Sequence, residues 1–316
     1  MQLPFFFKLP LMLCAFMPIA YAAEQSADRS QVAFFSLGAG DLPPPNSHTL
    51  LANYIYNDWD KLTDHNGDNN ADFNQVSSKS RGMSIGYLHV TDKKLLGADY
   101  AYSVVVPYFD VTIDHALDTP VGDIPIYGKD KNYVGLFITP MMLQWRGEEW
   151  NQNFRINFGL PLTKYDDDNP ANVARDYVSA AAVYHSTYSF LPTWDWSLGL
   201  SYQYNFENMH NKHPQVPGPD GKYQNGDTLT LNTVIGKNFG PVGVGISGYW
   251  IEQLRDDTIN GLNVDGQKQK TIGVGPVASL VIPGKKSMLH LKYSKGIYTE
   301  EGVKGDFFNV FLTHSF

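Results

Sequence analysis

Hydrophobic and polar residues alternate along most of the chain after residue 47. In residues 194–207 every even position is tryptophan, leucine, tyrosine or phenylalanine, and every odd position is polar or glycine. Residues 153–163 and 242–250 follow the same pattern. Because successive side chains of a strand point to opposite faces, this period of two predicts strands with one apolar face and one polar face. These stretches exceed the about five or six residues usual in soluble sheets and reach the length that a tilted strand needs to cross a bilayer.

The chain contains many such segments, separated by connections of two kinds. We expect twelve strands, at residues 48–58, 80–91, 98–113, 132–146, 151–164, 176–190, 194–207, 226–239, 241–255, 269–282, 286–298 and 305–316. Short turns are expected at residues 93–95, 147–149, 191–193, 239–240 and 283–285. Long polar loops are expected at residues 59–79, 114–131, 165–175, 208–225, 256–268 and 299–304.

The regular alternation of short turns and long loops indicates how the strands are arranged. Bacterial outer-membrane barrels have short periplasmic turns and longer extracellular loops. The pattern therefore predicts an all-β fold, a transmembrane antiparallel up-and-down β-barrel of about twelve strands. An even number of strands places both ends of the barrel in the periplasm, and the expected location is the outer membrane of a Gram-negative bacterium.

The N-terminal region differs from the rest of the chain. Residues 1–22 resemble a signal peptide, because Lys8 precedes an apolar run at 9–20 and Ala20-Tyr21-Ala22 supplies the small-x-small cleavage pattern. We therefore expect export by the Sec route. Residues 23–47 are not strand-like and contain Pro43-Pro44-Pro45, which favours an extended segment. This segment is expected either in the barrel mouth or in the periplasm, and the barrel itself at residues 48–316.

Composition and charge narrow the function. The net charge is -8, without a basic patch, so nucleic acid is not an expected partner. The single cysteine, Cys14, lies in the expected signal peptide, so a cysteine metal site or disulfide is not expected in the mature chain. Aromatic residues reach 14%, a content that suits the aromatic girdles of a membrane barrel.

Two local patterns raise the question of chemistry. Asp64, Asn66 and Asp68 have the spacing of a calcium loop, but Gln75 occupies the position of the bidentate glutamate, so a solvated loop is favoured. His185 and Ser186 are adjacent, and neighbours on a strand point to opposite faces, so they cannot form a catalytic pair. We therefore predict no enzymatic activity, no metal and no cofactor.

The polar positions of the alternating strands should face the lumen. Such side chains in a barrel act as hydrogen-bonded filler or as pore lining. The candidates for lumen-facing residues are Arg155, His185, Gln203, Asn205, Glu207, Tyr249, His290 and Lys292.

The opposite positions define the expected partners. The lipid bilayer and lipopolysaccharide should surround the apolar face. The last expected strand carries Phe308, Val310, Leu312, His314 and Phe316 on one face. A terminal aromatic residue closing an alternating strand is similar to the signal read by the outer-membrane assembly machinery, which is a further expected partner.

Several short motifs occur in the order found in one family of exported proteins. The motifs are Leu42-Pro43-Pro44-Pro45, Leu50-Leu51-Ala52-Asn53-Tyr54, Asp64-His65-Asn66-Gly67-Asp68, Phe158-Gly159-Leu160-Pro161-Leu162-Thr163, Tyr204-Asn205-Phe206-Glu207-Asn208, Tyr223-Gln224-Asn225-Gly226-Asp227, Gly248-Tyr249-Trp250 and Gly273-Val274-Gly275-Pro276. Through them nearly the whole mature chain resembles the outer-membrane family named for the meta-pathway of phenol degradation. The resemblance implies a barrel for uptake of aromatic or other hydrophobic small molecules, without catalytic residues.

Three functions remain open at this point. The first is a channel or transporter for passive uptake of small hydrophobic or aromatic compounds. The second is a structural or adhesive barrel with a closed lumen. The third, less favoured because no nucleophile or acid–base set is found, is an outer-membrane lipase-type enzyme. The sequence does not fix the permeant or the oligomeric state, nor does it show whether residues 23–47 plug the barrel.

Overall fold

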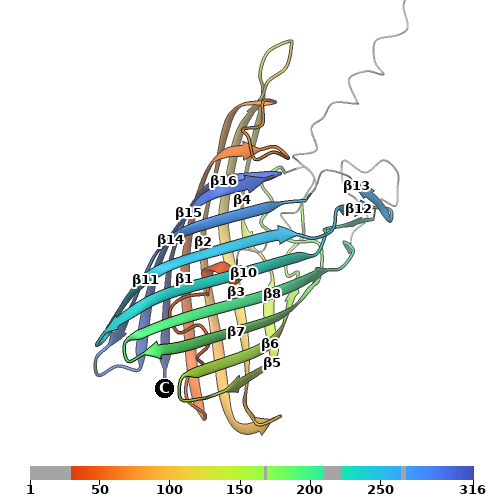
Figure 1. Cartoon of the computed structure of the whole chain (residues 1–316). Helices are drawn as coiled ribbons and strands as arrows, with labels where there is room; N and C mark the ends of the chain where they lie inside the picture. The colour runs from red at the N-terminus through yellow and green to blue at the C-terminus, as the bar shows by residue number, and fades with distance from the viewer. Residues whose placement is uncertain (1–29, 167–168, 210–221, 265–267) are drawn as a thin grey trace, which may run out of the picture.

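The computed structural model of the protein describes residues 30–166, 169–209, 222–264 and 268–316 (Figure 1). The expected signal peptide, residues 1–22, lies outside these ranges, as do residues 210–221 of the expected loop 208–225. The described part contains one helical turn, α1 (Ser30–Ala33), and is otherwise built of strands and their connections. It holds no helix with the length and apolar content needed to span a membrane.

One antiparallel sheet forms the wall of the molecule. Its strands are β1 (Ser47–Thr63), β2 (Phe73–Leu95), β3 (Ala98–Leu117), β4 (Ile124–Tyr133), β5 (Leu136–Trp145), β6 (Trp150–Leu160), β7 (Ser179–Leu191), β8 (Trp194–Asn205), β10 (Thr228–Phe239), β11 (Val242–Gln253), β14 (Lys270–Ile282), β15 (Ser287–Glu300) and β16 (Gly302–Ser315). Strand β1 pairs with β2 on one side and with β16 on the other, so the sheet closes into a barrel. Strands β4 and β5 both pair with β3 and form one strand of the wall. The predicted barrel of twelve antiparallel strands is therefore confirmed.

The connections divide the barrel into two ends. The five short turns lie at the end where β1 begins and β16 finishes, which is the periplasmic end by the rule for bacterial barrels. The long connections lie at the opposite, extracellular end. There a small separate sheet forms from β9 (Tyr223–Gln224), β12 (Asp257–Ile259) and β13 (Leu262–Val264).

The predicted strand limits differ from the observed ones mainly at the extracellular end. The expected loop 59–79 shortens to 64–72, and β4 occupies much of the expected loop 114–131. The prediction of a long loop at residues 299–304 is wrong, because only Glu301, with a φ of 48°, separates β15 from β16. Above the bilayer the outer face of a strand meets water, so the backbone pairing continues where the alternation in hydrophobicity ends.

The wall carries apolar side chains on its outer face and polar side chains on its inner face, the reverse of a soluble barrel. On β8 the outward Leu198, Leu200 and Tyr202 are 40%, 44% and 41% exposed. Ser201 and Gln203, which flank Tyr202 and point inward, are 3% and 5% exposed. A barrel with apolar side chains outside and polar side chains inside is stable only where the surroundings are hydrocarbon.

The wall is incomplete between β4 and β7 at the extracellular end. Strand β6 ends at Leu160, so β4 has a wall neighbour only in β3 among the described strands. The β6–β7 connection covers this edge: the Asn169 side chain donates to Lys129 O over 3.0 Å, and Val173 N donates to the Asp130 carboxylate over 2.9 Å. The edge strand therefore meets a loop in place of a neighbouring strand.

The sidedness of the barrel gives a direct prediction. Val121, in the β3–β4 connection, is 93% exposed, and Lys285 lies in the β14–β15 turn at the opposite end. Because Cys14 belongs to the expected signal peptide, a cysteine introduced at either position is unique in the mature chain. A membrane-impermeant maleimide added to intact cells should label Val121→Cys and leave Lys285→Cys unlabelled until the cells are lysed. The reverse pattern would show that the barrel is inverted.

Candidate functional site

The residues predicted to face the lumen occupy inward positions of the wall, with one exception. His185, Gln203, Asn205, Tyr249, His290 and Lys292 are each at most 8% exposed, and Arg155 is half-buried. Glu207 differs from the expectation because β8 ends at Asn205, so the alternation does not extend to it. Its exposed carboxylate instead lies 3.6 Å from Lys222 Nζ.

The lumen is occupied by the chain itself. We call residues 30–46 the plug segment, and Figure 1 shows it in red to orange inside the barrel. It begins with α1 and reaches β1 at the periplasmic rim. Within it Val32, Ala33 and Phe35 are at most 2% exposed, and Leu37 is 7% exposed. Of the two positions left open by the sequence for residues 23–47, the described part occupies the interior of the barrel.

Polar side chains of the wall hold the inner part of the plug segment by its backbone. Lys292 Nζ donates to Val32 O over 2.9 Å and to Phe35 O over 3.2 Å. Asn309 Nδ2 donates to Ala33 O over 2.8 Å. These carbonyl groups belong to α1 and the residues after it, where a short helix leaves its last acceptors without helical partners. Val32 O also accepts from Phe35 N over 3.3 Å, so the wall adds to the few hydrogen bonds that so short a helix forms itself.

Apolar side chains of the plug segment pack on apolar patches of the inner wall. Three groups follow one another along the segment. The first consists of Val32 and Ala33 with Ile55, Phe109, Tyr249, Ile251 and Phe307. The second consists of Phe35, Leu37 and Ala39 with Val234 and Val277. The third consists of Leu42 with Leu51, Leu88, Val90, Ala101 and Met142. We call the wall residues of the three groups the apolar track; it contacts the plug segment from Val32 to Leu42.

Phe35 is fixed by a close contact with the wall. Its ring meets the His185 ring edge-on, with centroids 5.0 Å apart and an interplanar angle of 84°. A Cβ atom at Gly199 would lie 2.6 Å from Phe35 Cε2, so only glycine leaves room for the ring at this position. Arg155 also contacts His185, with its Nη2 atom 3.2 Å from His185 Nε2.

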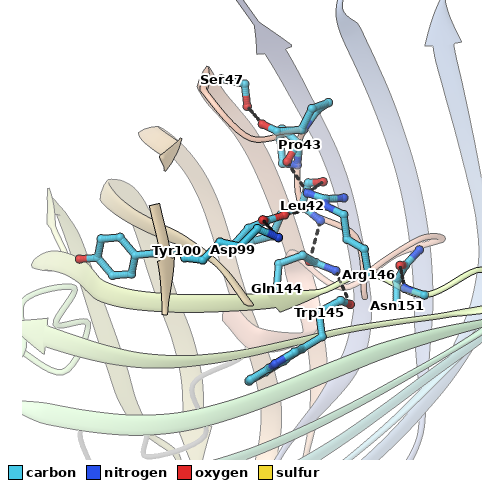
Figure 2. Close-up of polar contacts among 12 residues, drawn as sticks. Leu42, Pro43, Ser47, Asp99, Tyr100, Gln144, Trp145, Arg146 and Asn151 are labelled. Carbon is cyan, nitrogen blue, oxygen red and sulfur yellow. Dashed lines mark hydrogen bonds and ion pairs between the residues drawn. The ribbon is translucent and has the colours of Figure 1, made fainter. Parts of the chain in front are cut away.

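The periplasmic end of the plug segment has a second set of polar contacts, centred on Arg146 (Figure 2). The guanidinium donates to Leu42 O over 3.1 Å and to Pro43 O over 2.7 Å, and its Nε atom lies 2.9 Å from the Asp99 carboxylate. Gln144 accepts a hydrogen bond from Leu42 N over 3.0 Å. Because Pro43 opens a run of three prolines with restricted backbones, this clamp fixes the direction in which the chain enters the lumen.

Two further backbone groups of the plug segment are held between the clamp and the middle of the lumen. Thr187 Oγ1 accepts from Gly40 N over 2.8 Å, and Asn153 Nδ2 donates to Ala39 O over 3.1 Å. A Cβ atom at Gly40 would lie 2.3 Å from Thr187 N, so the segment touches the wall backbone here. The plug segment is thus hydrogen-bonded to the wall at its middle as well as at its periplasmic end.

The two basic residues among the lumen candidates, Arg155 and Lys292, lack acidic partners within the described residues. Neither Arg155 nor Lys292 forms an ion pair with a carboxylate in the part of the chain that the structure describes. Within the same residues no group of three or more histidine, cysteine, aspartate or glutamate side chains is placed to hold a metal ion. His185 contacts Phe35 in the lumen, whereas Ser186 lies on the other face of β7 beside Leu198. The arrangement suits the holding of a peptide segment and gives no nucleophile–base pair at these two residues.

The alternation of polar and apolar residues predicts polar positions facing the lumen but not the apolar track. Ile55, Phe109, Val234, Ile251 and Phe307 are all inward residues that break the rule of a polar lumen face. A usable signal was present in residues 32–42, where valine, phenylalanine and leucine side chains recur in a segment that no predicted strand includes. Apolar residues outside the strands need a place to be buried, and the lumen is that place.

Comparisons with known proteins agree with the barrel fold. The model of the family described as "Putative MetA-pathway of phenol degradation" matches residues 60–311. An outer membrane channel from Pseudomonas putida F1 is similar in structure, with a TM-score of 0.73 at 14% identity over 89% of this chain and 100% of that chain. The translocator domain of the autotransporter NalP from Neisseria meningitidis has a TM-score of 0.50 at 11% identity, over 94% of this chain and 99% of that chain. No curated protein matches the chain.

Proposed function

Because the chain belongs to this phenol-degradation family, we propose that it is an outer-membrane channel for passive uptake of small hydrophobic or aromatic compounds. The plug segment closes the lumen at rest, and a solute passes when the segment shifts along or away from the inner wall. An outer membrane has no nucleotide supply, so movement of the solute follows its gradient. The residues predicted to face the lumen, apart from Glu207, then serve to hold the plug segment and to line the path.

The apolar track is the observation that carries this proposal. A lumen meant only for water and salts needs polar lining, yet the inner wall presents tyrosine, phenylalanine, isoleucine and valine side chains beneath the plug segment. The side chains of Val32, Phe35 and Leu37 occupy this surface in the structure. An aromatic solute can replace them with little change in the buried apolar area of the wall, so its entry offsets the cost of moving the plug segment away.

The polar attachment of the plug segment suits a reversible closure. Most of its described hydrogen bonds to the wall join a side chain to a backbone group, and a typical bond of this kind contributes about 0.5–1.5 kcal/mol net. In a hydrated lumen, water can take over a bond that opens. The segment can therefore detach stepwise without unfolding the wall.

The second candidate function is a structural barrel whose lumen stays closed. The same filled lumen favours it, because the plug segment is held at both its inner part and its periplasmic end. The two functions differ in one respect only, namely whether the segment moves.

An uptake experiment separates them. Asn309 reaches Ala33 O, so cysteines at Ala33 and Asn309 can be joined by a short bis-alkylating reagent that locks the plug segment to β16. In cells without a hydrocarbon channel of their own, the native chain should raise the initial uptake of radiolabelled toluene several-fold above cells with an empty vector. The linked double variant should return uptake to the vector level, while the same reagent should leave the native chain active.

Two outcomes would contradict the channel. Toluene uptake equal to that of vector cells, with the folded barrel present in the outer membrane, would favour the structural barrel. Equal uptake with and without the link would show that the solute does not pass through the lumen.

A further inference from the structure

Phe35 of the plug segment is packed against a fixed part of the inner wall. Its side chain is 0% exposed and contacts Val234 and Val277. Its ring also meets His185 edge-on, and glycine at Gly199 leaves room for it. These wall residues lie on β7, β8, β10 and β14, which the backbone pairing of the barrel holds in place without the plug segment. The wall therefore carries a preformed site for one aromatic ring.

The backbone of the same phenylalanine is held by a buried cation. Lys292 Nζ donates to Phe35 O over 3.2 Å and to Val32 O over 2.9 Å, and the lysine is 2% exposed. No carboxylate pairs with it among the described residues. A buried ammonium group is ordinarily compensated by an opposite charge, which a neutral carbonyl does not supply. The site of Lys292 therefore suits an anion better than it suits the plug segment.

A second cation lies near the Phe35 ring. Arg155 Nη2 is 3.2 Å from Nε2 of His185, the residue whose ring Phe35 meets. The Nε atom of Arg155 is buried and has no hydrogen-bond partner among the described residues. Charges inside the barrel are screened less by salt than charges on its surface. An aromatic solute that replaces Phe35 is therefore favoured if it also carries a negative charge.

The covalent structure of Phe35 defines the spacing between ring and anion. Two carbon atoms, Cβ and Cα, separate its ring from the carbonyl group that Lys292 binds. The 3-phenylpropanoate ion has the same ring and the same two-carbon spacer, and it has a carboxylate in the place of the carbonyl. The carboxylate offers Lys292 an opposite charge in addition to a hydrogen-bond acceptor. Such an ion can therefore compete with the plug segment for both of its contacts.

We propose that the wall site of Phe35 binds aromatic carboxylates whose ring and carboxylate are separated by two carbon atoms, and that the plug segment imitates this ligand. The solute ring takes the place of the Phe35 ring, and the carboxylate accepts from Lys292 Nζ. This inference rests on the proposed passage of aromatic compounds and adds a preferred class of solute, the arylpropanoate anions. The solute releases the plug segment by competing for Lys292.

Hydrogen–deuterium exchange on the full barrel in detergent tests the proposal, because a ligand in the Phe35 site has to release the plug segment. The probe is 3-phenylpropanoate at neutral pH, where a carboxylic acid is ionised. The comparison ligand is 3-phenylpropanamide, which has the same ring and spacer but no charge. We expect 3-phenylpropanoate to speed exchange of the plug amides saturably, and the amide to need about ten times its concentration.

Two variants separate the charge from the attachment of the plug segment. Lys292→Met removes the bonds to Val32 O and Phe35 O together with the cation, whereas Asn309→Leu removes the bond to Ala33 O and keeps the cation. Equilibrium dialysis with radiolabelled 3-phenylpropanoate gives the affinity of each. Because a loosened plug competes less, Asn309→Leu should bind at least as tightly as the native chain. Lys292→Met should bind about tenfold more weakly or worse.

Four results would overturn the proposal: no saturable binding of 3-phenylpropanoate, equal binding of the amide, binding that Lys292→Met leaves unchanged, or binding that does not speed exchange of the plug amides. The last two would show that the anion lies elsewhere. Failure of the proposed function is recognised separately by toluene uptake. A barrel that admits toluene without binding the anion lacks only the carboxylate site, and one that binds the anion without raising toluene uptake lacks only the channel.

Discussion

Replacing Leu200 with arginine should largely prevent assembly of the barrel, whereas the same replacement at Val242 should be tolerated. Leu200 is central in β8 and 44% exposed on the outer face, so its surroundings are the hydrocarbon core. An arginine at the bilayer midplane costs about 2–4 kcal/mol, and the cost falls to about 0–1 kcal/mol near the interfaces. Val242, the first residue of β11, is 40% exposed on the same outer face but lies at the periplasmic rim.

The two variants form a matched pair, because only strand β10 separates β8 from β11 and both positions are apolar and outward. Refolding into lipid vesicles, followed by electrophoresis with and without boiling, gives the folded fraction of each. Leu200→Arg should lose most of the heat-modifiable band, and Val242→Arg should keep it. Equal folding of the two would mean that depth in a bilayer does not matter, and the membrane assignment of the outer face would be wrong.

Replacing Lys292 with methionine should loosen the plug segment without weakening the wall. Lys292 is 2% exposed, and its Nζ atom holds Val32 O and Phe35 O. A hydrogen bond to a charged group contributes about 1.5–3 kcal/mol, so loss of both bonds removes a large part of what holds α1. The wall itself no longer has to bury an ammonium group without a carboxylate partner, a change that is neutral or stabilising.

Hydrogen–deuterium exchange resolves these two effects. In Lys292→Met the backbone amides of the plug segment should exchange at least tenfold faster than in the native chain, while the strand amides keep their protection. The control is Lys237→Met, an outward lysine of β10 that lies over the ring of Trp194. Slow exchange of the plug segment in Lys292→Met would show that apolar packing alone holds it.

The sequence determined the barrel to a large extent because a membrane imposes a simple rule on each strand. From residue 176 onward the predicted strands agree with the observed ones to within a few residues, and Leu198, Leu200 and Tyr202 point outward as the alternation requires. The rule applies only where one face meets lipid. It could not show that β15 and β16 continue into a tight turn at Glu301, since those residues lie beyond the hydrocarbon.

The contents of the lumen were less predictable for a related reason. Polar and apolar side chains are both acceptable inside a barrel if another segment covers them, so alternation does not report on what fills the interior. Lys292 could be placed in the lumen from the pattern of β15, but its partners are backbone carbonyls of residues about 260 positions away along the chain. Such hydrogen bonds leave no mark in the sequence of the acceptor, because every residue has a carbonyl.

The central claim is that the plug segment closes a lumen that would otherwise conduct, and single-channel recording in planar bilayers tests it most directly. The native chain should show rare or small openings. A variant lacking residues 30–42 keeps the three prolines and the whole wall, and it should show a steady conductance many times larger, with Lys292→Met lying between the two. A deletion variant that conducts no more than the native chain, while still folding as a heat-modifiable barrel, would contradict the claim.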